Sequence, residues 1–236
     1  MKLEEFKIEL KKACEKNKIM LLEEQIEKFY KYMNLLIEWN QKINLTAIVE
    51  PKEIIQKHFI DSMSVLDYIQ DKKNIIDVGT GAGFPGIPIK IANPNINVTL
   101  LDSLQKRVNF LEEVVSQLEL DKIKAVHSRA EDYAKENRES YDVAISRAVA
   151  NMSTLVEYLL PYVKQDGIVI CMKGPNIEDE LEKSKKAISI LGGKIEHIEH
   201  LFLDEEMERN LIIIRKIKPT PKQYPRKAGK PAKEPI

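Results

Sequence analysis

The stretch Asp77-Val-Gly-Thr-Gly-Ala-Gly-Phe-Pro-Gly86 closes the short apolar run 74–79 and leads into a helical stretch. Glycine lets the backbone turn sharply and leaves room for a ligand, because it has no Cβ. In an open parallel sheet, ligands bind beyond the carboxyl ends of the strands, near the point where the strand order reverses. The stretch therefore predicts a ligand-binding loop in an α/β sheet, with a tight turn that binds nothing as the alternative.

The rest of the chain supports an α/β fold. Short apolar runs that predict strands lie at 74–79, 96–102, 123–127, 141–146 and 167–172. Helical stretches lie at 103–118, 151–162 and 176–191, the last with Asn176 as its expected N-cap. This alternation predicts five parallel strands joined by right-handed crossovers. The segments 194–203 and 210–216 are joined only by the acidic loop 204–208, which predicts a final antiparallel hairpin.

Three parts of the chain differ in composition. Residues 1–70 carry helical apolar stripes, such as Leu22, Ile26, Phe29, Met33 and Leu36, and predict an N-terminal helical extension. The strands and helices above place the main domain at 71–218. Residues 219–236 hold five prolines without apolar periodicity, and predict a basic extended arm.

Composition limits the class of protein. With 43% hydrophobic and 31% charged residues, most of the chain is expected to be ordered and globular. The two cysteines, Cys14 and Cys171, form no metal or disulfide pattern, which indicates a reducing compartment. No run of 18 apolar residues and no signal-peptide core occurs, so we expect a cytoplasmic protein without a membrane partner. The arm is either solvated or binds a polyanion.

Two ligand classes are compatible with the glycine stretch. The segment from Gly81 to Gly86 satisfies the G-x-G-x-x-G pattern of dinucleotide loops, which would indicate an NAD-dependent oxidoreductase. That match begins after the strand has ended, and Pro85 lacks an N–H where a pyrophosphate would need one. The other pattern places Asp77 two residues before Gly79, where a carboxylate suits the cationic S-adenosylmethionine. Neither class needs a metal, and no metal-ligand pattern is present.

Residues after the next strands are further candidates. Asp102 ends the second strand and is expected to accept both ribose hydroxyls of either ligand, or to cap the following helix. Ser128 and Glu131 form an S-x-x-E capping box, while Ala130 and Glu131 also suit an adenine edge. Arg147 follows the fourth strand and can orient a ligand, but it cannot abstract a proton.

Several motifs resemble the bacterial small-subunit ribosomal RNA guanine-N7 methyltransferase family, also called the glucose-inhibited division protein B family. The resemblance covers nearly the whole chain, and in the cofactor loop Phe-Pro-Gly86 is far more specific than the glycines before it. The other motifs are Trp39-Asn-Gln-Lys-Ile-Asn-Leu-Thr46, His58-Phe-Ile-Asp61-Ser62, Leu101-Asp-Ser-Leu104 with Lys106-Arg107, Ser146-Arg-Ala148, Lys173-Gly174, and Tyr224-Pro-Arg226 with Ala228-Gly229.

The resemblance implies a Rossmann-like class I methyltransferase fold, with a seven-stranded, mostly parallel sheet and an antiparallel last strand. It implies methyl transfer to N7 of one guanine in the decoding-region loop of 16S rRNA. N7 carries a lone pair and no proton, so it can attack in line without a general base, and Arg147 would only orient the reactants. The cofactor residues implied, together with those expected above, are Asp77, Gly79, Gly81, Phe84, Asp102, Ser103, Leu104, Ala130, Glu131 and Arg147.

The partner expected is 16S rRNA, the small ribosomal subunit or its assembly intermediate, bound by a monomer. The candidate RNA-binding residues are Lys173, Arg107, Arg209, Arg226 and Lys227. His58 and Asp61 are expected to bond each other or to form a lid. Removing 219–236 is expected to weaken RNA binding and to leave cofactor affinity intact. A non-catalytic RNA-binding or assembly factor and, less strongly, the NAD-dependent oxidoreductase are the alternatives.

Overall fold

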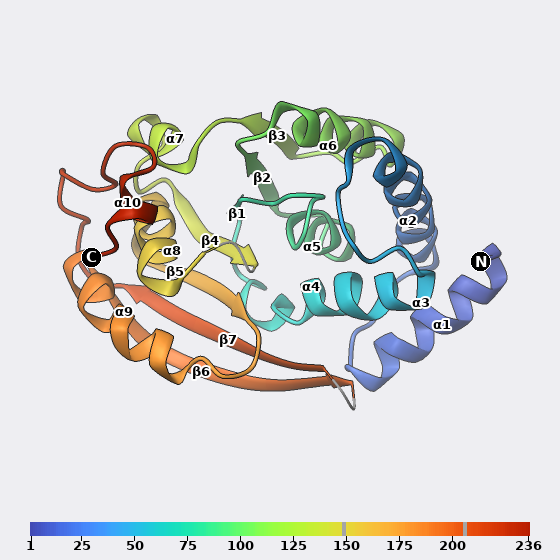
Figure 1. Cartoon of the computed structure of the whole chain (residues 1–236). Helices are drawn as coiled ribbons and strands as arrows, with labels where there is room; N and C mark the ends of the chain where they lie inside the picture. Colours follow the sequence, from blue (N-terminus) through green and yellow to red (C-terminus); the bar gives the residue numbers. More distant parts are fainter. Residues whose placement is uncertain (148–149, 205–206) are drawn as a thin grey trace.

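The computed structural model describes residues 1–147, 150–204 and 207–236, and its core is one seven-stranded sheet in the order β3-β2-β1-β4-β5-β7-β6 (Figure 1). Strands β1 to β5 are parallel, and β7 is antiparallel to both of its neighbours. This confirms the predicted α/β fold and its final hairpin. The strands are β1 (Asn74–Val78), β2 (Asn97–Asp102), β3 (Ile123–His127), β4 (Tyr141–Arg147), β5 (Val163–Lys173), β6 (Gly193–Asp204) and β7 (Met207–Lys216).

Helices cover the sheet and precede it. They are α1 (Leu3–Lys16), α2 (Glu23–Ile43), α3 (Pro51–Ile54), a π-helical turn (Ile55–Ile60), α4 (Asp61–Met63), α5 (Gly86–Ala92), α6 (Gln105–Gln117), α7 (Ala130–Glu136), α8 (Met152–Leu159), α9 (Glu178–Ile190) and α10 (Lys230–Lys233), with 3₁₀ turns at Leu66–Tyr68 and Leu160–Tyr162. The predicted N-cap of α9 is wrong: Ile177 takes that position, and Asn176, one residue earlier, has a left-handed φ of 61°. Ala148 of the Ser146-Arg-Ala148 motif and the middle of loop 204–208 lie outside the described residues.

Each face of the sheet has its own apolar core, because successive side chains of a strand point to opposite sides. Ile75 and Ile170 face the core formed with α2, α5 and α6. Their chain neighbours Ile76 and Val169 face the core formed with α7, α8 and α9. Both faces are therefore covered, and the strands read as apolar runs for this reason.

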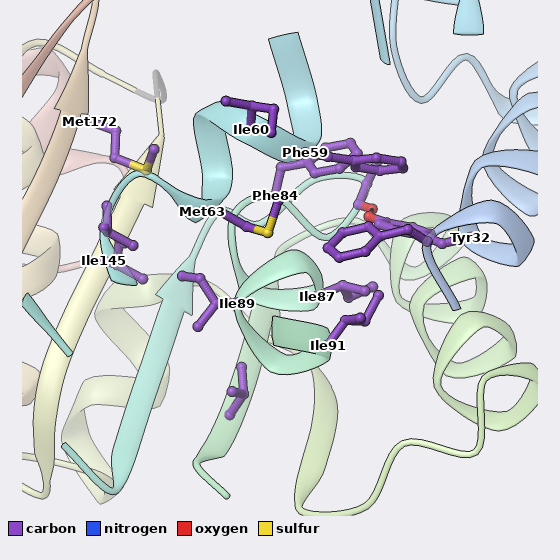
Figure 2. Close-up of a cluster of buried hydrophobic side chains, with 14 of the residues drawn as sticks. Tyr32, Phe59, Ile60, Met63, Phe84, Ile87, Ile89, Ile91, Ile145 and Met172 are labelled. Atoms are coloured by element: carbon purple, nitrogen blue, oxygen red, sulfur yellow. Dashed lines mark hydrogen bonds between the residues drawn. The ribbon is translucent and has the colours of Figure 1, made fainter. Parts of the chain in front are cut away.

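The N-terminal helices pack against the second half of the glycine stretch. Phe84 lies 5.5 Å from the ring of Tyr32 and 6.3 Å from that of Phe59, measured between centroids. Figure 2 shows these three rings gathered beside Met63. The hydroxyl of Tyr32 donates to the carbonyl oxygen of Ala82 at 2.5 Å, and this bond is buried. Tyr32 of α2 thus fixes the backbone of the loop at Ala82.

The two ends of the chain lie far apart. The N-terminus is beside α1, and the C-terminus is beside α8 and α10, at the opposite end of the view in Figure 1. Within the described ranges, no helix has both the length and the apolar character that crossing a membrane requires.

Candidate cofactor site and target face

The glycine loop lies between β1 and α5, where the connections reverse direction across the sheet. Gly79, Gly81 and Gly83 have φ values of 72°, 62° and 98°, a region that side-chain-bearing residues rarely adopt. The N–H of Gly79 donates to the carbonyl oxygen of Leu101 at 2.8 Å, which ties the loop to β2. The glycines are thus required by the backbone path, and the loop is placed where open α/β sheets bind ligands.

Asp77 holds the loop together from beneath. Its side chain is fully buried, and one oxygen accepts from the Thr80 hydroxyl at 2.6 Å and from the Gly86 N–H at 2.8 Å. The other oxygen, Oδ1, has no hydrogen-bond partner among the described residues. Burial raises the pKa of Asp77 to about 7, against the lowering effect of the two bonds. A cationic group nearby would favour the charged form, and so the carboxylate suits the cofactor that the sequence predicts.

A cavity of about 320 Å³ opens beside the loop, at the carboxyl ends of β1, β2 and β3. Gly79, Asp102, Ser103, Ala130 and Glu131 of the predicted cofactor residues line it. The remaining lining residues, which sequence reasoning missed, are Val78, Leu101, Ser128, Arg129, Tyr158, Gly229 and Ala232. Apolar walls with a few convergent polar groups are typical of small-molecule sites.

Asp102 is both a loop clamp and a wall of the cavity. Its Oδ2 accepts from the Gly81 N–H at 2.9 Å, and its Oδ1 accepts from the Leu104 N–H at 2.9 Å. The expected capping of α6 by Asp102 is wrong, because Leu104 is the N-cap and no side chain caps this helix end. Contact with a ligand stays open to the carboxylate, since each oxygen has two lone pairs. Leu104 contributes its backbone to this arrangement, while its side chain is 41% exposed and lies outside the cavity lining.

The predicted capping box at the start of α7 is wrong. Arg129 is the N-cap residue, and no side chain caps this helix end. The hydroxyl of Ser128 donates to the carbonyl oxygen of Arg129 at 3.2 Å, and Glu131 Oε1 accepts from the N–H of Gly229 at 2.8 Å. A residue 98 positions later in the chain thus replaces the local partner, and it does so at the wall of the cavity.

Arg147 lies on the other side of the glycine loop, in a polar cluster with the N-terminal extension. Its guanidinium donates to Asp61 Oδ2 and to the Lys57 carbonyl oxygen, each at 3.0 Å, and lies 3.0 Å from His58 Nδ1. It also lies 4.9 Å from the ring centroid of Phe84. We call Arg147, Phe84, His58 and Asp61 the Arg147 cluster.

The spacing of His58 and Asp61 suggested a bond between them. In the structure both side chains instead bond Arg147. His58 Nε2 is 3.0 Å from the Thr46 hydroxyl, and its ring stacks on Phe84 at 4.3 Å. Burial, followed by the charge of Arg147, lowers the pKa of His58 to about 3. The imidazole is therefore neutral at physiological pH, with both nitrogens engaged.

The candidate RNA-binding residues differ in the exposure of their side chains and in whether these already pair with a carboxylate. Lys173 is 9% exposed and its ammonium bonds Glu180 at 2.7 Å, while Arg209 donates to Asp61 at 3.1 Å. Arg226 pairs with the fully buried Glu157 at 2.6 Å. Arg107 lies 3.4 Å from Asp102, whereas Lys227 is exposed. Lys227 thus remains the one of the five whose side chain stands in solvent.

No group of three or more potential metal-ligating side chains occurs within the ranges that the structure describes. A larger hollow of about 460 Å³ lies at the turn between α1 and α2, lined by Cys14, Met20 and Leu22 among others, away from the carboxyl edge of the sheet. The chemistry therefore belongs to the glycine loop, its cavity and the Arg147 cluster.

Comparisons with known proteins agree with this arrangement. Residues 25–212 match the family model of rRNA small subunit methyltransferase G. A curated relative from Desulforamulus reducens, named ribosomal RNA small subunit methyltransferase G, is 54% identical over 97% of this chain and 98% of its own length. A relative of the same name from Clostridium botulinum strain Eklund 17B is 55% identical over 95% of this chain and 96% of its own length.

Solved structures show the fold alone at low identity. The TYW2 protein of M. jannaschii, solved in complex with AdoMet, has a TM-score of 0.54 and 14% identity over 66% of this chain and 77% of its own. The Rossmann-like methyltransferase architecture is thus shared well beyond close relatives. Because the family model spans most of the chain and the curated relatives align along nearly all of it, the chain belongs to the rRNA small subunit methyltransferase G family.

Proposed function

We propose that this protein transfers the methyl group of S-adenosylmethionine to N7 of one guanine in the decoding-region loop of 16S rRNA. The observation that carries the proposal is the pairing of a cofactor-sized cavity with the adjoining Arg147 cluster, whose His58 and Asp61 are already bonded. Both lie at the carboxyl edge of the sheet, on either side of the glycine loop. Family membership supports ribosomal RNA as the substrate class.

The chain's own residues account for cofactor binding. Asp102 faces the cavity with a carboxylate that can accept ribose hydroxyls, and Ala130 presents its backbone at the same cavity. The glycine loop, held by Asp77 and by Tyr32 behind Ala82, would receive the methionine end. When bound, the cofactor supplies an electrophilic methyl group on a sulfonium. Gly81, Phe84, Ser103, Leu104 and Glu131 are proposed to support this site through their backbone or by fixing its walls.

The Arg147 cluster suits a nucleophile that carries no proton. His58 is kept neutral and bonded at both nitrogens, Asp61 accepts from two arginines, and Asp77 is buried. None of these groups is available to abstract a proton. Guanine N7 needs no such group, and alignment of reacting atoms can supply about 7–11 kcal/mol of the barrier. Arg147 is proposed to orient the reactants from its fixed position over Phe84.

RNA contact is proposed for the outer surface of the same edge. Lys227 and Arg107 are candidates for phosphate contacts, since they keep partly or fully solvated side chains. Lys173, Arg209 and Arg226 would act by shaping the surface as much as by charge, because each already pairs with a carboxylate. The bacterial cytoplasm is the location, since the small ribosomal subunit is made there. The three segments are proposed to share these tasks. Residues 1–70 contribute His58 and Asp61 to the Arg147 cluster, 71–218 carry the glycine loop, and 219–236 carry Lys227.

The test uses purified protein, methyl-labelled S-adenosylmethionine and small-subunit particles from cells that lack the modification. We expect label in 7-methylguanosine at a single loop position after digestion to nucleosides. Free 16S rRNA is assayed in parallel to decide between RNA and particle as substrate. Asp102→Ala serves as the inactive control, and Glu38→Gln, on the exposed face of α2, as the active one. Label in a different nucleoside would contradict the N7 assignment, and RNA binding without label would support a non-catalytic role.

A further inference from the structure

The C-terminal arm, residues 219–236, is anchored to the body of the protein along its whole length. The guanidinium of Arg138 donates to the carbonyl oxygens of Tyr224, at 2.5 Å, Pro221, at 3.0 Å, and Thr220. The N–H of Thr220 donates to Glu139 Oε1 at 2.8 Å. The arm is therefore not a solvated tail, although it has little regular structure.

Its strongest anchor is an ion pair with a buried carboxylate on α8. Glu157 is fully buried, and its Oε2 accepts from Arg226 Nη2 at 2.6 Å while its Oε1 accepts from Arg226 Nε at 2.9 Å. The backbone N–H of Arg226 donates to the same Oε1 at 2.8 Å. Two-pronged bonds of this kind are strong and directional. The pair fixes the point at which the arm turns toward the cavity.

Beyond Arg226 the arm crosses the cofactor cavity. The N–H of Gly229, whose φ of 82° favours glycine, donates to Glu131 Oε1 at 2.8 Å. The hydroxyl of Thr154 donates to the carbonyl oxygen of the buried Pro231 at 3.1 Å. At and just beyond these two points, Gly229 and Ala232 line the cavity of about 320 Å³ together with residues from the strand ends. Figure 1 shows α10 lying between α7 and α8 at this side of the sheet.

We propose that the arm is the outer wall of the cofactor site, that Gly229 and Ala232 contact the adenosine part of the cofactor, and that residues 226–233 must lift for it to enter or leave. The inference rests on the proposed cofactor and concerns residues outside the sheet. The sheet lines the cavity through residues such as Val78 and Asp102, and the arm lines it through Gly229 and Ala232. This reverses the expectation that cofactor affinity is independent of 219–236.

Cofactor affinity in full-length variants tests the inference. Arg226→Gln removes the charge that holds the arm to Glu157, and Ala232→Trp places a large side chain in the wall. Each is expected to raise the Kd for S-adenosylhomocysteine about 10-fold or more by titration calorimetry, and Arg226→Gln is also expected to speed its release. Lys222→Gln, an exposed arm residue outside the cavity lining, is the matched control with an unchanged Kd.

Hydrogen exchange of the unmodified protein supplies an independent readout that does not depend on a variant's stability. We expect the ligand to slow amide exchange both in the glycine loop and in residues 226–233. Protection of the loop alone, with equal affinity in all variants, would overturn the role of the arm and leave the proposed function standing. Failure of the wild-type protein to bind S-adenosylmethionine or S-adenosylhomocysteine would overturn the proposed function and the inference together.

Discussion

Asp61 joins the N-terminal extension to two strands of the sheet, and its replacement by Asn tests how much that junction contributes. Its side chain is 2% exposed, and its two oxygens accept from Arg147 of β4 at 3.0 Å and from Arg209 of β7 at 3.1 Å. Asp61→Asn keeps one acceptor oxygen and turns the other into an amide donor that faces an arginine. One guanidinium then loses its partner in a largely desolvated site.

The expected loss follows from burial and hydrogen bonding. Removing one partner of a buried ion pair destabilises a protein by about 3–5 kcal/mol. The side chains of Arg147 and Arg209 are 16% and 26% exposed, so water can partly replace the lost contact. We therefore expect the lower end, about 3 kcal/mol, which is roughly a 100-fold change in the unfolding constant. Methyl-transfer rate should fall as well, because Arg147 loses its anchor.

Urea unfolding gives the free energy of unfolding directly. The signal is the fluorescence of Trp39, the one tryptophan of the chain, which packs 5.6 Å from the ring of Phe110. The control is Glu38→Gln, which breaks an ion pair between Glu38 and Lys42 whose two side chains are 60% and 59% exposed. It should lower the free energy of unfolding by less than about 0.5 kcal/mol. A loss below about 1 kcal/mol for Asp61→Asn, at an unchanged denaturant slope, would show that the junction is not a desolvated ion pair.

Two further predictions concern the loop and the Arg147 cluster. Gly83→Ala should lower stability by about 1–2 kcal/mol or more and weaken cofactor binding, because φ is 98° and a Cβ would lie 2.4 Å from Ile87 Cδ1. Gly174→Ala, with nothing within 4 Å, is its control, and equal melting temperatures for the two would contradict the prediction. For His58, the pKa lowered from 6.5 to about 3 means that the unfolded chain takes up a proton that the folded chain resists. Stability from this group should fall as pH drops from 6.5, by at most about 1.4 kcal/mol per pH unit. His58→Asn keeps an acceptor for Arg147 and should remove this contribution to the pH dependence between about pH 4 and 6. The measurement is the free energy of unfolding of both proteins across that range, and an equal pH dependence in the two would argue against the prediction.

Local pattern was enough to predict the sheet and the residues at its carboxyl edge. Strands that are covered on both faces appear in the sequence as apolar runs and are easily predicted. The ends of these runs then give the positions of Asp102 and Arg147 along the sheet. Their surroundings depend on segments that no spacing rule connects. The side chain of Arg147 points toward α4 and not toward the cavity, because it bonds Asp61 and His58 of the N-terminal extension.

Long-range partners also explain the errors. The sequence pairs Ser128 with Glu131 at helix-cap spacing, but Gly229 occupies that carboxylate. His58 and Asp61 are three residues apart, but they bond a common arginine near the end of a π-helical turn, where ordinary helix spacing does not hold. A solvated arm was one of the two expectations because its composition is rich in prolines and lysines. Its anchors, such as the buried Glu157 that pairs with Arg226, lie far away in the sequence.

Because the proposed outer wall of the cofactor site lies in the arm, which follows the last strand of the sheet, the order of synthesis matters. Protein chains fold from the N-terminus as they emerge from the ribosome. The sheet ends with β7 at Lys216, so all of its strands are synthesised before the arm. Cofactor capture would then await the packing of the arm against Glu157 and Glu131. A chain that stops before residue 226 should therefore bind the cofactor weakly even where its sheet is formed.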